Sequence, residues 1–564
     1  MTGMPSDAGE AVEQGPLSIK RGVPLDERPR LLGALLDASA RRFPTRVAVD
    51  FLGATTTWGA LAEAVDRAAA GLQALGVVKG TRVALCLPNT PYYPILFYAT
   101  LKAGGIVVNV NPLYVERELA HLIHDSGAEI IVTCDLAEIQ ARVLKVSRET
   151  GIRHVVSCPI ADVLPGIKKV AYKLLKRKEI GRAPRDAMHL HYRDLMAKGK
   201  VPAAVAVSPD EVAVLQYTGG TTGLPKAAML SHANIVANTD AMLVHVGGET
   251  PDQDRVMGVL PLFHVFALTN VLTFSTLVGA EMILLPRFEM EQLLAALKRT
   301  RPTYFPAVPT IYNALANLSD ADVPDLSSIK VCISGGAPLP IEVRHLFEQR
   351  TGAKLVEGYG LSEASPIITC NPFQGINKEG SAGLPFPGTT IEIRDREDPS
   401  RIMPKGEKGE ICARGPQVMS GYWHKPHETA GAFADGALRT GDVGYLDDDG
   451  YLFIVDRIKD MILCGGYNVY PRVIEEALYE HPAVAEAVVI GIPDPYRGQS
   501  PKAFVTLAEP GSVTGEQLRD FLRDKVSKIE LPRAVEIRDT LPKTLIGKLS
   551  KKELVEEEMR KAGQ

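Results

Sequence analysis

Ten residues between Tyr217 and Lys226 carry the clearest chemical signal in this chain. They read Tyr-Thr-Gly-Gly-Thr-Thr-Gly-Leu-Pro-Lys, with three glycines, three threonines and one lysine. Glycine lets the backbone approach a ligand closely, exposed N–H groups in such a loop bind anions, and hydroxyl and ammonium groups donate to phosphate oxygens. The pattern predicts a polyphosphate loop, and the alternative is a Gly/Thr-rich surface loop. It is not a Walker A loop, because Lys226 lies between Pro225 and Ala227.

Seven further segments follow this loop in an order that resembles one known superfamily. They are Pro-Leu-Phe-His-Val-Phe at 261–266, Ser-Gly-Gly-Ala-Pro-Leu at 334–339, Glu-Gly-Tyr-Gly-Leu-Ser-Glu at 357–363, Arg-Thr-Gly-Asp at 439–442, Asp-Arg-Ile-Lys-Asp at 456–460, Gly-Gly-Tyr-Asn-Val-Tyr-Pro at 465–471 and Gly-Lys at 547–548. Together they resemble the acyl-adenylate-forming enzymes, which include acyl-CoA synthetases, firefly luciferases and the adenylation domains of peptide synthetases.

The resemblance is strongest to bacterial long-chain fatty-acid–CoA ligases, and it rests on the sequence segments 415–423, 456–463 and 467–471. It implies ATP, Mg²⁺ and CoA as cosubstrates. A fatty acid would attack ATP to give an acyl-adenylate and pyrophosphate, and CoA would then displace AMP. Medium-chain or aryl acids remain alternative substrates, a carrier protein remains an alternative acceptor, and a catalytically inactive scaffold and a luciferase are the more distant alternatives.

The resemblance also assigns roles to individual residues. Tyr359 offers an aromatic face for adenine, and the carboxylate of Asp442 can accept from both ribose hydroxyls. The turn that carries Asp442 would, by its residues alone, suit a structural role equally well. The predicted ATP- and AMP-binding residues are Thr218, Gly219, Gly220, Thr221, Thr222, Gly223, Lys226, Gly335, Gly336, Ala337, Glu357, Gly358, Tyr359, Gly360, Leu361, Ser362, Asp442 and Arg457. Glu363, with Thr218, would hold Mg²⁺, which commonly uses one carboxylate with phosphates and waters.

Three residues are predicted to be catalytic by the same resemblance. Lys548 would bridge the attacking carboxylate and the α-phosphate, His264 would border the carboxylate pocket, and Lys459 would be the hinge about which the C-terminal domain rotates. A histidine between aromatic residues is also typical of a hydrophobic core, and the lysines around 548 would suit a solvated face. Gly465, Gly466 and Tyr467 would line the CoA channel. Leu463 departs from the pattern, because luciferases and other relatives carry a lysine there.

Composition narrows the class of protein. The chain has 564 residues, 45% of them hydrophobic, and a net charge of −4, which gives no general attraction to nucleic acid. Its seven cysteines are scattered with no Cys-x-x-Cys pair, which favours a reducing cytoplasm and argues against disulfides or structural zinc. The polar N-terminus lacks a secretory h-region, and no apolar run is long enough to span a membrane. We expect residues 1–25 to be a disordered lead-in.

Strand-like and helix-like stretches alternate along the first part of the chain. Strands are expected at 82–87, 106–110, 129–133, 330–334 and 354–357, with helices at 94–102, 114–124 and 340–350 between them. This βαβ rhythm predicts an α/β fold with two doubly wound lobes, whose ligands bind at the carboxyl ends of the strands. A small antiparallel β region should follow from about 391 to 455. The resemblance implies a 26–456 AMP-binding domain, a hinge near 456–460 and a small mobile α+β domain over 457–564.

One segment, residues 165–182, stands apart from these motifs. Apolar residues recur at helical spacing from Ile167 to Leu175, and lysines and arginines occupy the remaining positions. A basic amphipathic helix can lie on an anionic membrane surface, so the segment is a candidate for peripheral contact with the inner membrane. The alternative is a solvated insertion whose apolar face packs on the domain. A homodimer is a further expectation from the resemblance alone.

Overall fold

The protein is described from a computed structural model. The structure describes residues 24–184, 186–218, 225–250, 252–465, 467–544 and 547–562. The predicted lead-in therefore lies almost wholly outside the described residues, apart from its last two positions. Six residues of the predicted phosphate loop and one of the predicted CoA-channel residues also lie outside them; these are Gly219, Gly220, Thr221, Thr222, Gly223, Leu224 and Gly466.

The first lobe is built on a seven-stranded sheet. Its order is β7-β6-β5-β3-β4-β8-β9, and every neighbouring pair is parallel except β8 with β9, which is antiparallel. The strands are β3 (Arg82–Cys86), β4 (Ile106–Asn109), β5 (Ile130–Cys134), β6 (His154–Cys158), β7 (His189–His191), β8 (Val212–Thr218) and β9 (Lys226–Ser231). The crossover helices are α3 (Tyr92–Lys102), α4 (Glu116–Ser126) and α5 (Ala137–Arg148). The βαβ prediction is confirmed here, with boundaries shifted by a few residues.

The second lobe is built on a nine-stranded sheet of order β16-β15-β14-β13-β12-β10-β11-β1-β2. Its central strands are parallel, and antiparallel strands close both edges. The strands are β1 (Val47–Phe51), β2 (Ala54–Thr57), β10 (Arg255–Gly258), β11 (Glu281–Leu284), β12 (Tyr304–Ala307), β13 (Val331–Ser334), β14 (Leu355–Gly360), β15 (Ile367–Cys370) and β16 (Leu384–Pro385). The expectation of two doubly wound lobes is confirmed.

Strand β14 is longer than the sequence predicted. Residues 355–357 pair with β13 in parallel, but Gly358, Tyr359 and Gly360 pair only with β15, in antiparallel register. The motif expected to follow the strand is therefore its last part. Because β13 ends at Ser334, one side of this extension is left without a strand neighbour, beside the turn at Gly335.

Helices complete the two lobes. The first lobe and its flanks contain η1 (Leu25–Glu27), α1 (Leu32–Arg42), α2 (Trp58–Ala74), η2 (Ile160–Val163), α6 (Gly166–Leu175), η3 (Arg177–Glu179), α7 (Tyr192–Ala197) and α8 (His232–His245). The second contains α9 (Val265–Ala267), the π-helical turn η4 (Leu268–Thr273), α10 (Phe274–Val278), α11 (Met290–Thr300), α12 (Pro309–Ala316), α13 (Ile341–Thr351) and η5 (Ser362–Ala364). Tyr98 of α3 donates to Thr276 of α10 inside the shared core, so the two lobes are joined by buried packing.

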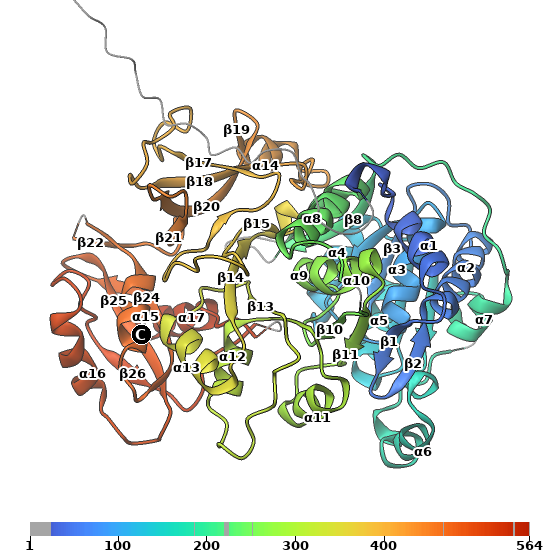
Figure 1. The fold of residues 1–564 in the computed structure, drawn as a ribbon, viewed down its shortest axis with the longest axis horizontal. Helices are drawn as coiled ribbons and strands as arrows, with labels where there is room; N and C mark the ends of the chain where they lie inside the picture. Colours follow the sequence, from blue (N-terminus) through green and yellow to red (C-terminus); the bar gives the residue numbers. More distant parts are fainter. Residues whose placement is uncertain are drawn as a thin grey trace, which may run out of the picture.

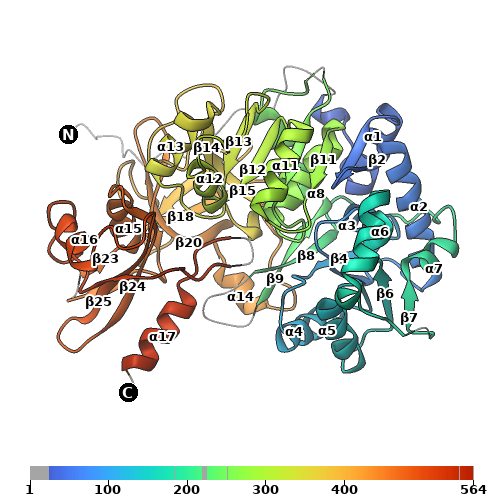
Figure 2. The ribbon, with the colours of Figure 1, turned by 90° about the horizontal axis from the view of Figure 1, so that it is seen from below.

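An antiparallel β region and a small C-terminal unit follow. The β region contains β17 (Thr390–Arg394), β18 (Gly409–Arg414), α14 (Pro426–Gly431), β19 (Phe433–Ala434), β20 (Ala437–Leu446) and β21 (Leu452–Arg457), and all its strand pairs are antiparallel. The last unit contains β22 (Ile462–Cys464), β23 (Tyr467–Val469), α15 (Pro471–Tyr479), β24 (Val484–Asp494), β25 (Gly498–Leu507), α16 (Gly515–Phe521), η6 (Leu522–Asp524), β26 (Val535–Ile537) and α17 (Lys552–Ala562). Figures 1 and 2 show this unit at one end of the molecule.

The C-terminal unit has hydrophobic clusters of its own. Ile462, Val469, Ile474 and Val505 belong to one of them. In the described residues, every hydrophobic cluster lies wholly before or wholly after the turn at 458–461. Hydrogen bonds cross the boundary instead, as where Thr310 of α12 donates to the carbonyl of Gly547. A small α+β unit is therefore present at the C-terminal end. Of the residues predicted as a hinge, 456–457 end β21 and 458–460 form a turn, and the hinge itself stays a prediction.

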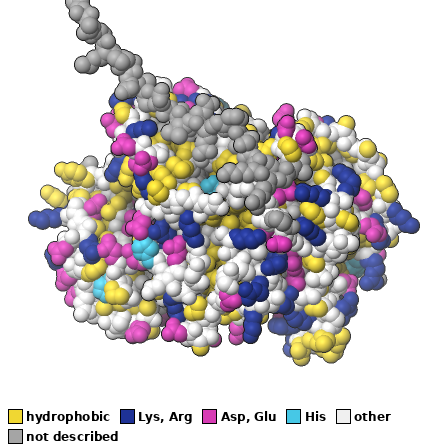
Figure 3. Space-filling model, viewed as in Figure 1, with side chains coloured by type: hydrophobic (Ala, Val, Ile, Leu, Met, Phe, Trp, Pro, Cys, Tyr) yellow, Lys and Arg dark blue, Asp and Glu magenta, His cyan; other side chains and the backbone are white. Residues whose placement is uncertain are grey.

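Helix α6 is the insertion that the basic amphipathic pattern predicted. It lies between β6 and β7 at the edge of the first lobe (Figure 1), where hydrophobic side chains gather on the surface beside Lys and Arg (Figure 3). No residue of α6 is buried. In the part of the chain that the structure describes, we find no helix with the length and hydropathy needed to cross a membrane.

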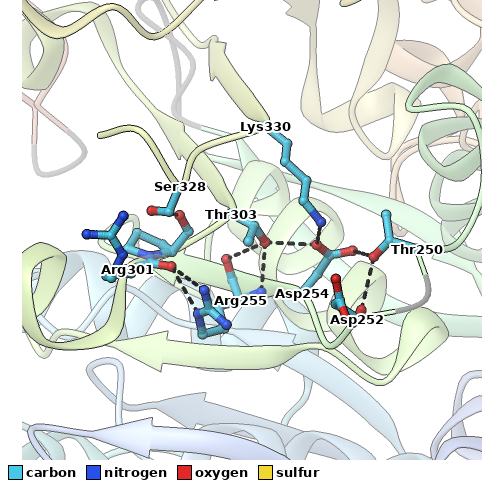
Figure 4. Close-up of polar contacts among 9 residues, drawn as sticks. Thr250, Asp252, Asp254, Arg255, Arg301, Thr303, Ser328 and Lys330 are labelled. Carbon is cyan, nitrogen blue, oxygen red and sulfur yellow. Dashed lines mark hydrogen bonds and ion pairs between the residues drawn. The ribbon is translucent and has the colours of Figure 1, made fainter. Parts of the chain in front are cut away.

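A polar cluster joins the amino ends of strands in the nine-stranded sheet, at the opposite end of the strands from the Gly335 turn. Asp254 precedes β10, and its carboxylate accepts from Thr250, from Thr303 before β12 and from Lys330 before β13 (Figure 4). The Arg255 guanidinium donates to the carbonyl of Arg301. Because Asp254 is 6% exposed and bonded on both oxygens, it fixes three neighbouring segments at one end and leaves the carboxyl ends free for a site.

Candidate active site

Asp442 is the centre of a cluster of polar residues beside the carboxyl ends of the strands in the second lobe. It lies on β20 and accepts a 2.5 Å hydrogen bond from the hydroxyl of Tyr359, on the extension of β14. Arg457 is its register partner on β21, with Nε 3.4 Å from the Asp442 carboxylate. Burial raises the pKa of Asp442, and the charge of Arg457 opposes that rise. Three residues that the sequence predicted as nucleotide contacts are therefore brought together from separate strands.

Lys548 reaches the same place from the C-terminal domain. A Cβ added to Gly336 would lie 2.7 Å from its Cε atom, so its side chain occupies space that only glycine leaves open. Gly336 also has φ +83°, a conformation that other residues rarely adopt. The segment that carries Lys548 is tied down by Thr310, which donates to the Gly547 carbonyl at 2.8 Å. The predicted catalytic lysine and the Gly335–Gly336 turn are thus in contact.

Burial changes the protonation of both Lys548 and His264. It lowers the pKa of Lys548 to about 8, with the positive charge of Arg457 adding to the effect and the negative charge of Asp442 opposing it. Burial lowers the pKa of His264 to about 3, and Lys548 contributes. The His264 ring is therefore neutral at pH 7. Its Nδ1 accepts from the Phe266 N–H at 3.3 Å, which leaves Nε2 as the protonated nitrogen and a donor.

Two buried side chains that sequence reasoning missed hold the segment that carries His264. Asn89 donates to the carbonyls of Gly258 and Leu260 and accepts from the N–H of Leu262. Gln216 of β8 donates to the carbonyl of Phe263. These bonds join the end of the first lobe's sheet to the turn before His264. A lone buried amide gives no sequence pattern, so no signal could have identified either residue.

The predicted phosphate loop closes the hairpin between β8 and β9. Thr218 and Lys226 are register partners at its base, and the Thr218 hydroxyl donates to the Lys226 carbonyl at 3.3 Å. The loop itself lies outside the described residues. The two strand residues that flank it, Thr218 and Lys226, lie at the carboxyl end of β8 and the amino end of β9.

Tyr422 connects this hairpin to Glu363. Its hydroxyl donates to a Glu363 carboxylate oxygen at 2.8 Å, and its ring lies 4.7 Å from the Lys226 ammonium. The Trp423 N–H donates to Ala227, and the Met419 N–H donates to Glu363, so the whole segment is pinned between β9 and η5. The sequence analysis used residues 415–423 only as part of the family resemblance and assigned Tyr422 no role. Its position beside a predicted phosphate-binding lysine becomes evident only in three dimensions.

Two oxygen-bearing side chains suited to a hard cation lie on the elements that Tyr422 joins. Glu363 offers a carboxylate, and Thr218, at the end of the adjoining hairpin, offers a hydroxyl. No group of three or more His, Cys, Asp or Glu side chains in the described residues forms a metal cluster. Such a sparse oxygen set fits Mg²⁺, which keeps waters and takes substrate phosphates as ligands.

Other predicted nucleotide residues are placed less centrally. Glu357 is buried, and burial raises its pKa to about 7 while the nearby Arg472 of α15 lowers it. Its side chain thus faces the C-terminal domain, and no contact in the described residues joins it to Asp442. The remaining predicted residues, Ala337, Gly358, Gly360, Leu361 and Ser362, lie in the turns and strand ends around Tyr359.

The Lys548 site does not contain Gly465 or Tyr467, two of the residues predicted to line a CoA channel. Gly465 and Tyr467 belong to the β22–β23 turn, which Figures 1 and 2 place at the outer edge of the C-terminal domain. Gly465 has φ +59°, and a Cβ there would meet Cδ1 of Ile529 at 3.9 Å. Both Tyr467 and Leu463 are exposed. Lys459 is also exposed and follows β21 in the turn between the domains. This domain arrangement therefore brings Lys548, and not the turn, to Asp442.

Comparison with known proteins identifies the family. The family model described as "AMP-binding enzyme" matches residues 36–423, and "AMP-binding enzyme C-terminal domain" matches 473–548. The chain belongs to the AMP-binding enzyme family. It is 43% identical over 547 residues to the long-chain-fatty-acid–CoA ligase of Bacillus subtilis, covering 96% of this chain and 97% of that one. The resemblance to acyl-adenylate-forming enzymes, strongest to bacterial long-chain ligases, is confirmed.

Solved structures of other proteins share the fold over nearly the whole chain. The anthranilate CoA ligase AuaEII in complex with anthranoyl-AMP has a TM-score of 0.85 at 26% identity, covering 96% of this chain and all of that chain. ATP-bound MatB from Rhodopseudomonas palustris has a TM-score of 0.81 at 28% identity, covering 93% of this chain and 98% of that chain. The predicted α/β fold with a small C-terminal domain is confirmed.

The depressed pKa of Lys548 predicts unusual amine reactivity. We expect Lys548 to react with a small acylating reagent at half its maximal rate near pH 8, whereas a free lysine does so near pH 10.4. Asp442→Asn should lower this midpoint further, because it removes a negative charge, and Arg457→Gln should raise it. Mass-spectrometric labelling from pH 6 to 11 measures the midpoint. The urea-unfolded chain is the control, and an unfolded-like midpoint in the folded protein would contradict the burial of Lys548.

Proposed function

We propose that this chain is an AMP-forming long-chain-fatty-acid–CoA ligase, which activates the acid as an acyl-adenylate and transfers the acyl group to CoA. The observation that carries the adenylation step is the contact of Lys548 with the Gly336 turn beside Asp442 and Tyr359. The long-chain assignment rests on the 43% identical relative, which aligns over nearly its whole length.

The nucleotide would lie between the Gly335–Gly336 turn and Tyr359. Neither glycine has a side chain, so a flat base can lie against the backbone there. Asp442 would accept hydrogen bonds from the ribose hydroxyls, exchanging its present bond with Tyr359 for ligand contacts or sharing it. The charge of Arg457 opposes the rise in the pKa of Asp442 that burial causes, and its guanidinium would supply further donors.

The triphosphate would be held by the hairpin loop, with Lys226 at its base. Mg²⁺, bound by Glu363 and Thr218, would neutralise the phosphate oxygens. Tyr422 restrains Glu363 through its hydroxyl and Lys226 through its ring. The two charged groups that face the phosphates would thereby be set at one fixed separation, which favours a transition state in which charge moves between them.

Lys548 would act in the first half-reaction. The carboxylate and the α-phosphate repel each other, and an ammonium between them lowers the energy of the transition state more than that of the separate reactants. His264, which is neutral, would donate from Nε2 to orient the carboxylate without adding charge. Hydrogen bonds from Phe266 and Thr310 hold the segments that carry these two groups, so little reorganisation is needed when the reactants meet.

The second half-reaction would use another domain arrangement. Because polar bonds such as Thr310–Gly547 and Asn313–Ala485 cross between the domains, the C-terminal domain (457–564) could separate from 26–456 without exposing a hydrophobic cluster. Rotation about Lys459 in the 456–460 turn would remove Lys548 and bring Gly465, Gly466 and Tyr467 to the pantetheine arm of CoA. These domain bounds and residue roles are part of the proposal.

Aryl acids are the second candidate substrates. The shape similarity to an anthranilate CoA ligase favours them, whereas the sequence similarity favours long chains. A cytoplasmic location and a homodimer remain predictions.

A panel of acids from acetate to oleate, with anthranilate and benzoate, decides between substrates when AMP release is measured with ATP and Mg²⁺, with and without CoA. CoA-dependent release that is greatest at C12–C18 supports the proposal. A maximum among aryl acids overturns the substrate class, and CoA-independent activation points to a carrier protein.

Removing the Lys548 ammonium should separate the two half-reactions. Lys548→Ala should slow adenylate formation by about 10²–10³-fold or more, and it should leave thioester formation from supplied acyl-adenylate unchanged. In the wild type, kcat/KM for adenylation should fall as pH rises through about 8, because the lysine then loses its proton. Lys548→Arg should abolish that fall. Lys552→Ala, a change at an exposed lysine of α17, is the control. Equal loss of both half-reactions would refute this division of roles.

The bridging role of Tyr422 predicts a graded loss. Tyr422→Phe removes one hydrogen bond to a carboxylate and should lower kcat/KM for ATP about tenfold, with a higher Mg²⁺ requirement. Tyr422→Leu should cost about two- to fivefold more, because the ring face that meets Lys226 is also lost. KM for the fatty acid should not change, and Tyr496→Phe, at a 95% exposed ring, should match the wild type. A Tyr422→Phe variant with an unaltered Mg²⁺ dependence would contradict the bridge.

A further inference from the structure

Helix α6 presents an apolar stripe to solvent. Ile167, Val170, Leu174 and Leu175 are 89%, 58%, 73% and 82% exposed, although they recur at the spacing of a buried helix face. Figure 3 shows the resulting hydrophobic patch at the edge of the molecule where Figure 1 draws α6. The alternative in which this face packs on the domain is therefore wrong. Four large apolar side chains on ten residues form a contiguous exposed patch, which marks an interaction site.

The helix is attached to the domain by its opposite face. Tyr172 packs against the core of the first lobe. Lys168 donates to the carbonyl of Leu52 in the β1–β2 turn, and Lys169 pairs with Asp162 at 3.1 Å. These contacts fix the rotation of α6 about its axis. The stripe is thus held outward by the fold and does not result from a loose segment.

Positive charge surrounds the stripe. Lys173, Arg177 and Lys178 are exposed, and in the described residues none of them forms an ion pair. Lys176 is paired with Glu179, and Lys168 and Lys169 have their amines bonded beneath the helix. The free positive charge therefore lies at the C-terminal end of the helix, next to the exposed Leu174 and Leu175.

We propose that α6 is a docking surface for an anionic lipid bilayer. An amphipathic helix with apolar side chains on one face and cations beside them lies in the plane of the headgroups, with its apolar face inserted. A second copy of this chain does not fit the patch as well, because its own cations would face those of the first. If the proposed function holds, docking would also bring the enzyme to the phase in which long-chain acids dissolve.

Vesicle sedimentation tests the proposal without requiring catalysis. The full chain is mixed with vesicles of phosphatidylcholine alone, or of phosphatidylcholine with phosphatidylglycerol. We expect binding to the anionic vesicles that weakens with salt. The triple variant Ile167→Ser/Leu174→Ser/Leu175→Ser and the variant Lys173→Glu/Arg177→Glu/Lys178→Glu should each reduce the partition coefficient by at least about tenfold.

Matched variants elsewhere on the surface serve as controls. Val78→Ser/Val201→Ser/Ile376→Ser removes three exposed apolar side chains. Lys405→Glu/Lys528→Glu/Arg560→Glu makes the same change in charge on exposed residues of the β region and the C-terminal domain. Both should bind vesicles as the wild type does, and the calorimetric unfolding profile of every variant should match that of the wild type, because none of the changed residues is buried.

Three results would overturn the proposal: wild-type binding by the α6 variants, equal loss in the controls, or no preference for anionic vesicles. If the serine variant instead converts a dimer into a monomer with vesicle binding unchanged, the stripe is an interface between copies. Turnover of octanoate in vesicle-free buffer should be the same for all variants. A chain that binds vesicles but activates no acid would refute the proposed function and leave the docking surface intact.

Discussion

One partly buried ammonium group sets the requirements for much of this structure. Lys548 lies at the interface of two domains, where burial disfavours its charged form. It can remain there because Gly336 has no Cβ and because Asp442 supplies a compensating negative charge. Asp442, in turn, is held by Tyr359 and Arg457, which come from different sheets. The two strand ends, the β20–β21 pair and the docked C-terminal domain thus depend on each other through one cation.

The other half of the site also depends on one side chain. Tyr422 makes two contacts of different kinds, a hydrogen bond to a carboxylate and a ring contact to an ammonium. The tyrosine thus links the Lys226 ammonium to the Glu363 carboxylate through its own side chain. The backbone bonds of residues 419–423 to β9 and η5 hold the ring in this position.

Much of the fold and the list of site residues could be predicted from sequence, for different reasons. Alternating strands and helices in the first lobe follow from local periodicity, so β3 to β5 were predicted within a few residues. The extension of β14 was not, because its pairing with β15 depends on a partner that only the fold supplies. Tyr359, Asp442 and Lys548 were found through motifs. Asn89, Gln216 and Tyr422 were not, since a single polar residue gains its meaning only from distant neighbours.

The separate hydrophobic clusters on the two sides of the 458–461 turn have a consequence for measurements of stability. A chain whose cores do not merge need not unfold in one cooperative transition, and a single melting temperature is then not a property of the whole molecule. Calorimetry would resolve the small domain and the large one as distinct components. A ligand that bridges Lys548 and Asp442 would couple them, so cooperativity itself becomes a reporter of whether the domains are docked.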